Sequence, residues 1–327
     1  MSKHAVNREG KKVALHVATS AVGDSICAIP TIRKVAHAYQ KQITVFTHYP
    51  NLFQGHPYIY EALNIRDINE DDYDIFHTFK PLAGKIHHLK YGNREQIIEW
   101  RHQNCDIRQY HAISLGFTLT EDEMECDLYA EYPNPLPYGK YVLIHPTNTW
   151  PSRTWSEYKW QKLIDELNER NIPVVAIGKD SKERGWHNVQ KPVMNVNIKL
   201  GVNLLNDPNC TLEKVRWMMN HQALTFITMD SGLLHLAGTT DVNIIQLGGN
   251  IDPRLRAPYR KGNQWYNYTY LKGPCNHCGS NMEYNVKEHG TFMASPPLVR
   301  CHCEGVTEIG PKVKPVLEEV QKLLENN

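Results

Sequence analysis

Short apolar segments alternate with amphipathic segments along most of this chain, and this alternation constrains the fold more than any other feature. The apolar segments have the length of buried strands, and the amphipathic ones repeat their apolar residues at helical spacing. Pro30 lies inside the first predicted helix and should kink it or limit its first turn. This order predicts parallel sheets built from strand–helix–strand units. The predicted strands are 13–19, 43–49, 72–79, 141–147, 173–179, 223–229 and 243–249, and the predicted helices are 25–39, 156–170, 211–222 and 313–327.

A proline-rich segment, EYPNPLPYG at residues 131–139, separates two such series and is typical of an interdomain linker. We therefore expect a two-lobed α/β protein. The predicted divisions are an N-terminal lobe at 1–135, a C-terminal lobe at 136–272, an insert at 273–304 and a C-terminal helix at 305–327.

The charge balance of the chain limits what it can bind. The 327 residues include 36 Lys or Arg and 35 Asp or Glu, for a net charge of +1. This argues against a protein that binds DNA or membranes through its overall charge. No apolar run is long enough to span a membrane, and the polar start MSKHAVNREGKK lacks a signal core, so we expect a cytoplasmic protein. Neither a G-x-G-x-x-G motif nor a P-loop motif is present, which excludes a standard dinucleotide fold and a P-loop NTPase.

The stretch ITMDSGLLHLAG, residues 227–238, ends a predicted strand at Asp-Ser-Gly and turns into a helix. Asp and Ser are ordinary helix caps, but a helix start also directs free backbone N–H groups at the strand's carboxyl end, where they bind anions. Both interpretations are open at this point. Ligands of parallel sheets bind beyond the carboxyl ends of the strands. Four turns carry small, polar or charged residues there: 20–25, 145–155, 178–180 and 230–235.

Residues 85–111 are rich in Lys, Arg and His. Such a run is either a solvated helical face or a surface for an anionic partner. Lys85, Lys90 and Arg94 are the candidates for the second interpretation.

Four of the eight cysteines form a C-x-x-C and C-x-C set at Cys275, Cys278, Cys301 and Cys303. In a reducing compartment, four thiolates grouped in this way predict one tetrahedral metal site. The metal would be structural, because four sulfurs leave no open position, and zinc or iron suits this donor set. One thiolate could be replaced by a nearby histidine, at position 277, 289 or 302.

Three blocks of sequence, in this order and spacing, resemble glycosyltransferase family 9, the ADP-heptose-dependent heptosyltransferases. They are VATSAVGDSICAIPTIRKV, YVLIHPTNTWPSRTWSEYKWQKL, and MDSGLLHLAG followed by VNIIQLGGNIDPR. The resemblance covers 13–39 and about 141–256, whereas 50–130 shows no match. The cysteine insert looks more like the autotransporter protein heptosyltransferases of the same clan.

This resemblance implies a GT-B fold, in which two Rossmann-like lobes face a cleft, with a small metal-bound finger near the C-terminus. It also implies an inverting transfer from a nucleoside-diphosphate sugar, without a catalytic metal. The lobe at 1–135 would bind the acceptor, and the lobe at 136–272 would bind the donor.

The resemblance and the chemistry of the residues agree on roles. Asp24 is the predicted general base, since a carboxylate is ionised at neutral pH and can take the proton of an attacking hydroxyl; it can cap its helix as well. Gly23 lies beside it on the acceptor side. Arg153 stands where most members carry Lys, and its guanidinium can bind two oxygens of the leaving diphosphate. The predicted donor contacts are Thr147, Gly178, Lys179, Asp180, Glu213, Asp230, Ser231, Gly232 and His235.

Some of these positions have an equally good structural explanation. Glu213 could simply favour the first turn of its helix. Trp150 and Trp155 are expected to pack at a helix entry rather than stack on a ligand.

Several acceptors and functions remain compatible with the sequence. The acceptor could be a lipopolysaccharide core, a hydroxymethylated DNA base or a protein hydroxyl, and the basic run mildly favours the first two. A non-catalytic nucleotide-sugar or nucleic-acid binding module is the alternative from another class. A GT-B epimerase would need further carboxylates near the sugar, which the sequence does not place.

Overall fold

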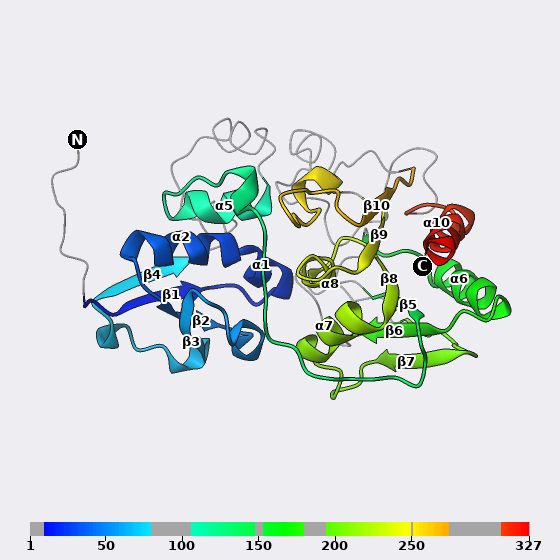
Figure 1. Cartoon of the computed structure of the whole chain (residues 1–327), viewed down its shortest axis with the longest axis horizontal. Helices are drawn as coiled ribbons and strands as arrows, with labels where there is room; N and C mark the ends of the chain where they lie inside the picture. The colour runs from blue at the N-terminus through cyan, green and yellow to red at the C-terminus, as the bar shows by residue number, and fades with distance from the viewer. Residues whose placement is uncertain are drawn as a thin grey trace, which may run out of the picture. The chain divides into compact units, whose positions relative to one another are not determined.

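The computed structural model describes residues 10–79, 106–147, 153–179, 194–249, 251–274 and 309–326. These residues form two compact units (Figure 1). The first holds 10–79 and 107–130, and the second holds Asp106 and the described residues from Glu131 onward. The four divisions drawn from the sequence, with the lobes meeting at 135/136, stay predictions.

The first unit is built on a sheet of four parallel strands in the order β3-β2-β1-β4. Its strands are β1 (Val13–Val17), β2 (Ile43–Thr47), β3 (Ile59–Asn64) and β4 (Ile75–Phe79). Its helices are α1 (Val22–Cys27), α2 (Ile29–Tyr39) and α5 (Ile107–Ser114), with short 3-10 turns η1 (Pro50–Phe53), η2 (Ile65–Asp67), η3 (Glu70–Asp72) and η4 (Glu121–Glu123). α5 packs against α1 and α2. The two central strands, β1 and β2, are almost entirely buried, as strands with a neighbour on each side must be.

The predicted helix 25–39 is two helices. α1 ends at Cys27 and α2 begins at Ile29, with Pro30 in its first turn. Proline lacks an N–H group and is tolerated only at the start of a helix. The predicted limit that Pro30 sets on the helix is confirmed, and its effect is to place Asp24 on a short helix of its own.

The second unit contains six parallel strands in the order β10-β9-β8-β5-β6-β7. They are β5 (Tyr141–His145), β6 (Val174–Gly178), β7 (Gly201–Leu205), β8 (Ala223–Thr228), β9 (Asn243–Leu247) and β10 (Tyr268–Leu271). The helices are α6 (Glu157–Glu169), α7 (Leu212–His221), α8 (Gly232–Ala237) and α10 (Val313–Glu325), and η7 (Pro253–Leu255) is a 3-10 turn. Because all strands run parallel, their carboxyl ends meet at one edge of the sheet.

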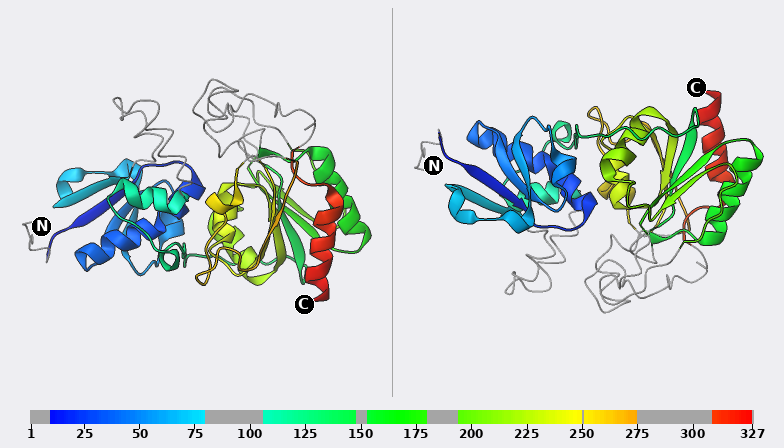
Figure 2. Two further views of the ribbon diagram at one scale, coloured as in Figure 1. Left: turned by 90° about the horizontal axis from the view of Figure 1, so that it is seen from above. Right: turned by 90° about the horizontal axis from the view of Figure 1, so that it is seen from below.

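The core of the second unit is completed by the last helix. α10 packs against α6 and runs beside it (Figures 1 and 2). Its buried residues Val316 and Val320 belong to the same apolar cluster as Trp155 and Trp160. The indole N–H of Trp155 donates to the carbonyl of Pro311 at 2.9 Å. Trp155 therefore packs at the entry to α6, as predicted, and is not available to stack on a ligand.

Four elements were not predicted from the sequence: β3, β7, β10 and α5. All three strands lie at the edge of a sheet. Each has a single neighbour and is largely half-buried or exposed, so its sequence lacks the continuous apolar run of a central strand.

Candidate functional site

Three neighbouring strands of the second unit end at the same edge of its sheet. β8, β5 and β6 are adjacent, and they end at Thr228, His145 and Gly178. The strand pairing sets His145 directly beside Thr228. The turns that follow these strands were predicted to hold the donor, and the structure brings those turns together.

The Asp-Ser-Gly turn follows β8 and begins α8. The Ser231 side chain accepts a hydrogen bond from the backbone N–H of Leu234 at 3.3 Å, so Ser231 is the N-cap. Gly232 is the first helical residue. The helix has only six residues, so its dipole is small, and charged side chains must supply most of the attraction for an anion.

Asp230 carries the central charge of this turn and is buried. Its Oδ2 lies 3.1 Å from Nη1 of Arg153. Burial alone would raise the pKa of Asp230, but the positive charges of Arg153, Arg256 and His235 outweigh it and hold that pKa below its ordinary value. The carboxylate is therefore ionised at neutral pH and holds Arg153 at the edge of the sheet.

A hydrogen-bonded network of one imidazole and three hydroxyls connects the ends of β5 and β8. His145 Nδ1 lies 3.2 Å from Thr228 Oγ1 and 3.1 Å from Ser231 Oγ. His145 Nε2 lies 3.1 Å from Thr147 Oγ1. Burial lowers the pKa of His145 to about 4, so the ring is neutral at neutral pH.

Gly178 ends β6 with φ of +134°, a conformation that L side chains rarely adopt. A Cβ atom there would lie 2.4 Å from Thr147 Oγ1 and 2.8 Å from Cδ2 of His145. The glycine therefore leaves room for the network. Lys179 follows it and is exposed.

Glu213 lies in the first turn of α7 and is buried. Its carbonyl accepts a hydrogen bond from the N–H of Tyr132 at 3.2 Å. A buried acid in a first turn is compatible both with the helix-start interpretation and with a nucleoside contact, and the two stay open.

The predicted base belongs to the first unit, where Asp24 lies in the first turn of α1 beyond the carboxyl end of β1. The Thr19 hydroxyl lies 3.5 Å from Asp24 Oδ2. Tyr49, just after β2, donates its hydroxyl to the Ser20 carbonyl at 2.5 Å. Burial and the negative charge of Asp24 raise the pKa of Tyr49. Gly23 is buried in the same helical turn.

Several predicted site residues lie outside the described part of the chain. They are Asp180, the basic candidates Lys85, Lys90 and Arg94, and the cysteines Cys275, Cys278, Cys301 and Cys303. Among the residues that the structure does describe, no group of three or more His, Cys, Asp or Glu side chains could hold a metal ion.

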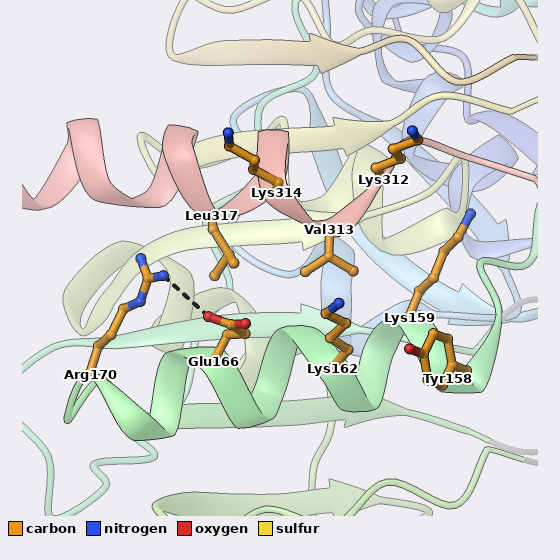
Figure 3. Close-up of a pocket in the computed structure, with 9 residues that line it drawn as sticks. All are labelled: Tyr158, Lys159, Lys162, Glu166, Arg170, Lys312, Val313, Lys314 and Leu317. Atoms are coloured by element: carbon orange, nitrogen blue, oxygen red, sulfur yellow. Dashed lines mark hydrogen bonds and ion pairs between the residues drawn. The ribbon is translucent and has the colours of Figure 1, made fainter.

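A hollow of about 510 Å³ lies between α6 and α10 (Figure 3). Lys162 rises from α6 toward Val313 of α10, and Glu166 pairs with Arg170 at 3.2 Å one helical turn away (Figure 3). None of the predicted site residues lines this hollow.

Sequence reasoning missed four residues around the site: His145 as the centre of the network, Thr228, Arg256 and Tyr49. His145 was inside a turn selected from the sequence, but its bonds depend on the pairing of β5 with β8. The sequence around Thr228 predicts only the end of a buried strand, so nothing in it indicated a role at the site.

In the described ranges, we find no helix with the length and apolar character needed to cross a membrane.

The family model for glycosyltransferase family 9 (heptosyltransferase) matches residues 98–285. Lipopolysaccharide heptosyltransferase 1 of Escherichia coli K12 is 24% identical over 185 residues, which are 56% of this chain and 54% of that protein. The same enzyme from E. coli O18:K1:H7 is also 24% identical, over 53% of its length. The chain thus spans about half the length of the curated relatives it matches.

Solved structures share the fold. The iron-containing dodecameric glycosyltransferase TibC from enterotoxigenic E. coli H10407 has a TM-score of 0.67 at 14% identity, over 97% of this chain and 80% of its own. A glycosyl transferase family 9 protein from Veillonella parvula has a TM-score of 0.61 at 15% identity, over 98% and 99% of the two chains. ADP-heptose lps heptosyltransferase II of E. coli has 0.58 at 15%, over 96% and 99%. The predicted fold class, with two parallel-sheet α/β lobes of the GT-B type, is confirmed.

Proposed function

Because this chain belongs to glycosyltransferase family 9, we propose that it transfers a sugar from a nucleoside-diphosphate sugar to a hydroxyl of an anionic acceptor. The observation that carries the proposal is the meeting of three turns at one sheet edge, with Arg153 held there by Asp230. That edge is where parallel sheets bind nucleotides. The curated relatives are named as heptosyltransferases, which supports a heptose or a similar sugar as the transferred group.

The leaving diphosphate gains negative charge as the glycosidic bond breaks. Arg153 is the proposed group that neutralises it, and its fork of N–H donors matches two phosphate oxygens. Arg256 adds positive charge near the same carboxylate. Thr147 and the backbone N–H groups of Ser231 and Gly232 are the proposed neutral donors. With cations and N–H groups in these roles, no catalytic metal is required by the proposal.

Asp230 has a different part in this proposal. An ionised carboxylate would repel a diphosphate, so its contribution is to fix the Arg153 guanidinium and not to contact the ligand. His235 lies on α8, the helix that follows Asp230, and adds to the positive charge around that carboxylate.

Asp24 is the proposed general base in an inverting displacement. It would remove the proton of the acceptor hydroxyl as that oxygen attacks the anomeric carbon from the face opposite the diphosphate. A neutral Tyr49, bonded to the Ser20 carbonyl, would hold the turn that carries this base.

The nucleoside is proposed to bind between the end of β6 and the start of α7. The proposed contacts there are Gly178, Lys179, Asp180 and Glu213. Among the described members of this group, Glu213 is buried and Lys179 is exposed. The carboxylate would suit ribose hydroxyls, and the lysine would suit a phosphate.

The acceptor is proposed to be a lipopolysaccharide core, with a hydroxymethylated DNA base or a protein hydroxyl as alternatives. The names of the curated relatives favour lipopolysaccharide. Lys85, Lys90 and Arg94 are the proposed acceptor contacts. Transfer to DNA would fall steeply as salt rises, because phosphate contacts release counterions, whereas transfer to a protein would change far less.

A structural metal bound by Cys275, Cys278, Cys301 and Cys303 is a further part of the proposal. Four thiolates are a donor set that suits zinc or iron. The structural neighbour TibC is described as iron-containing, which supports testing iron beside zinc. The metal would stabilise the insert and take no part in the transfer.

The test is the thermal stability of the purified protein with ADP, UDP, GDP, CDP and dTDP. A ligand at 100 times its Kd should stabilise the protein by about 2.7 kcal/mol. One nucleotide should raise Tm in the wild type and much less in Arg153→Ala. Arg170→Ala is the matched control, since that arginine pairs with Glu166 on α6, away from the sheet edge.

Equal stabilisation of wild type and Arg153→Ala would remove Arg153 from the donor site. No stabilisation by any of the five nucleotides would contradict the proposed transfer and favour a non-catalytic module that binds nucleic acid.

A further inference from the structure

The hydrogens in the network of His145, Thr147, Thr228 and Ser231 follow from the partners of each group. The Thr228 hydroxyl donates to the carbonyl of Met229 at 3.0 Å. Its single hydrogen is thus used, and Thr228 Oγ1 can only accept from the neighbours that reach it, Ser231 Oγ at 3.1 Å and His145 Nδ1 at 3.2 Å.

The imidazole of His145 is neutral, so one ring nitrogen donates and the other accepts. If Nδ1 carries the hydrogen, it donates to the oxygens of Thr228 and Ser231. Nε2 then accepts the hydroxyl hydrogen of Thr147. Every hydrogen in the network has a partner in this arrangement.

In the other tautomer Nε2 carries the hydrogen and donates to Thr147 Oγ1. Nδ1 then accepts the hydroxyl of Ser231. The hydrogen of Thr147 is left without an acceptor among the described residues, in a side chain that is only 4% exposed. A buried donor without a partner is unfavourable unless a ligand accepts its hydrogen.

An anion at the sheet edge would supply that acceptor. Gly178 lets its backbone approach the network closely, since a Cβ atom in its place would lie only 2.4 Å from Thr147 Oγ1. Arg153, held by Asp230 at the next turn, brings positive charge to the same edge.

We infer that His145 is a positioning residue that selects the direction of the Thr147 hydroxyl, and that binding of a diphosphate at this hydroxyl changes the ring from the Nδ1–H to the Nε2–H tautomer. The inference rests on the proposed function. The change adds no charge: Nδ1 releases one proton to water, Nε2 takes one from water, and the hydroxyls of Thr147 and Ser231 rotate. In the Nδ1–H form every hydrogen of the network has a partner within it, whereas in the Nε2–H form the Thr147 hydroxyl can donate its hydrogen to a phosphate oxygen.

The experiment is nitrogen NMR of the whole protein labelled with ¹⁵N-histidine, with and without ADP. His145→Asn identifies the signals of the ring by their loss. The nitrogen shifts should report the Nδ1–H form without ADP and the Nε2–H form with ADP. Calorimetry on the same samples shows whether ADP binds.

The outcomes separate this inference from the proposed function. Bound ADP with an unchanged tautomer overturns the inference and leaves the proposed function standing. The Nε2–H form without ligand also overturns it. If neither ADP nor the other four diphosphates bind, both fall.

Variants of Thr147 give a second readout. Thr147→Val keeps the shape and removes the hydroxyl, and it should weaken ADP binding about tenfold, the effect of losing one hydrogen bond to a charged group. ADP should then leave the ring in the Nδ1–H form. Thr147→Ser should restore both properties.

Thr225→Val is the matched control, because that buried hydroxyl donates to the Asn243 carbonyl and has no part in the network. If this control lost as much ADP affinity as Thr147→Val, the inference would be overturned.

Discussion

The Arg153 guanidinium lies 3.1 Å from the carboxylate of Asp230, and the exposed fractions of the two side chains are 18% and 8%. The pair joins the turn after β8 to the segment that leads from β5 into α6. The cation proposed for the donor phosphates is thus positioned by a buried acid in the turn that follows the neighbouring strand β8. Removing the acid should therefore affect both folding and ligand binding.

Asp230→Asn should destabilise the protein by about 3 kcal/mol, because breaking a buried ion pair leaves one charge uncompensated. It should also weaken nucleotide binding, since Arg153 loses its anchor. Urea denaturation measures the first effect and calorimetry the second. Asp241→Asn is the control: its pair with Lys261 is exposed to solvent and should contribute little to stability. Similar losses in the two variants would contradict the structural role of Asp230.

Asp24→Asn should reduce the rate of transfer by at least about a hundredfold, since the amide cannot accept the proton of the acceptor. Donor binding should be nearly unchanged, because the proposed donor contacts belong to the other unit. Initial rates and the nucleotide-induced rise in Tm are the two measurements. Undiminished turnover would remove Asp24 from the role of base.

Gly178→Ala should destabilise the second unit and abolish nucleotide binding. Its φ of +134° disfavours any side chain, and the new Cβ would lie 2.4 Å from Thr147 Oγ1. We expect a loss of more than about 1 kcal/mol. Gly139→Ala is the matched control, since a Cβ there meets no atom within 4 Å. The comparison uses Tm and the affinity for ADP, and equal behaviour of the two variants would contradict the close approach at Gly178.

Asp127 predicts a pH dependence in the first unit. Burial raises its pKa, but the His56 ring 3.5 Å away, the charge of Arg33 and the hydrogen bond from Tyr129 hold that pKa far below the usual range. The folded state therefore binds a proton here less readily than the unfolded chain. This stability is fully present above the unfolded pKa of about 4 and is lost as pH falls below it.

The measurement is the free energy of unfolding of wild type and Asp127→Asn between pH 6 and 3. The wild type should be the more stable at pH 6, and the difference should shrink as pH falls below about 4. A difference that grows on acidification would show the opposite sign of the pKa shift.

Cys275→Ser should lose bound metal and lower Tm, because a structural site depends on all four ligands. Metal content by elemental analysis tests this and separates zinc from iron. Cys126→Ser is the control, a buried cysteine of the first unit whose thiol donates to the Met124 carbonyl. Full metal occupancy in Cys275→Ser would contradict the four-thiolate site.

The central strands could be predicted from the sequence because burial on both faces requires a continuous apolar run, as in VVAIG of β6. Of the four edge strands, only β4 was predicted, within 72–79, and β3, β7 and β10 were not. The residues GVNLL of β7 are half-exposed and pair with a neighbouring strand on one side only. They therefore face solvent as well as the sheet and do not form a continuous apolar run. The division of 25–39 was foreshadowed by Pro30, whose missing N–H restricts where a helix can begin.

The site shows the same limit. Turns at strand ends could be selected because polar residues there serve no packing need, and Ser231 as a cap followed from its residue type. The contact of His145 with Thr228 and Ser231 depends on which strands pair and in which register. The amino-acid sequence alone does not give this register, so it could not predict that His145 connects Thr228 and Ser231.

The hydrogen bond from Trp155 to Pro311 makes the second unit depend on residues near the far end of the chain. Trp155 follows Arg153 closely, and Gly310 approaches its indole so tightly that a Cβ there would lie 2.6 Å from Cδ1. A premature stop codon before Pro311 would remove this hydrogen bond and α10, and it would expose the apolar cluster that α10 covers. All the residues at the sheet edge would still be present. Inactivating mutations in this protein should therefore also occur in a stretch outside the proposed donor site, and screens for loss of function should recover them there.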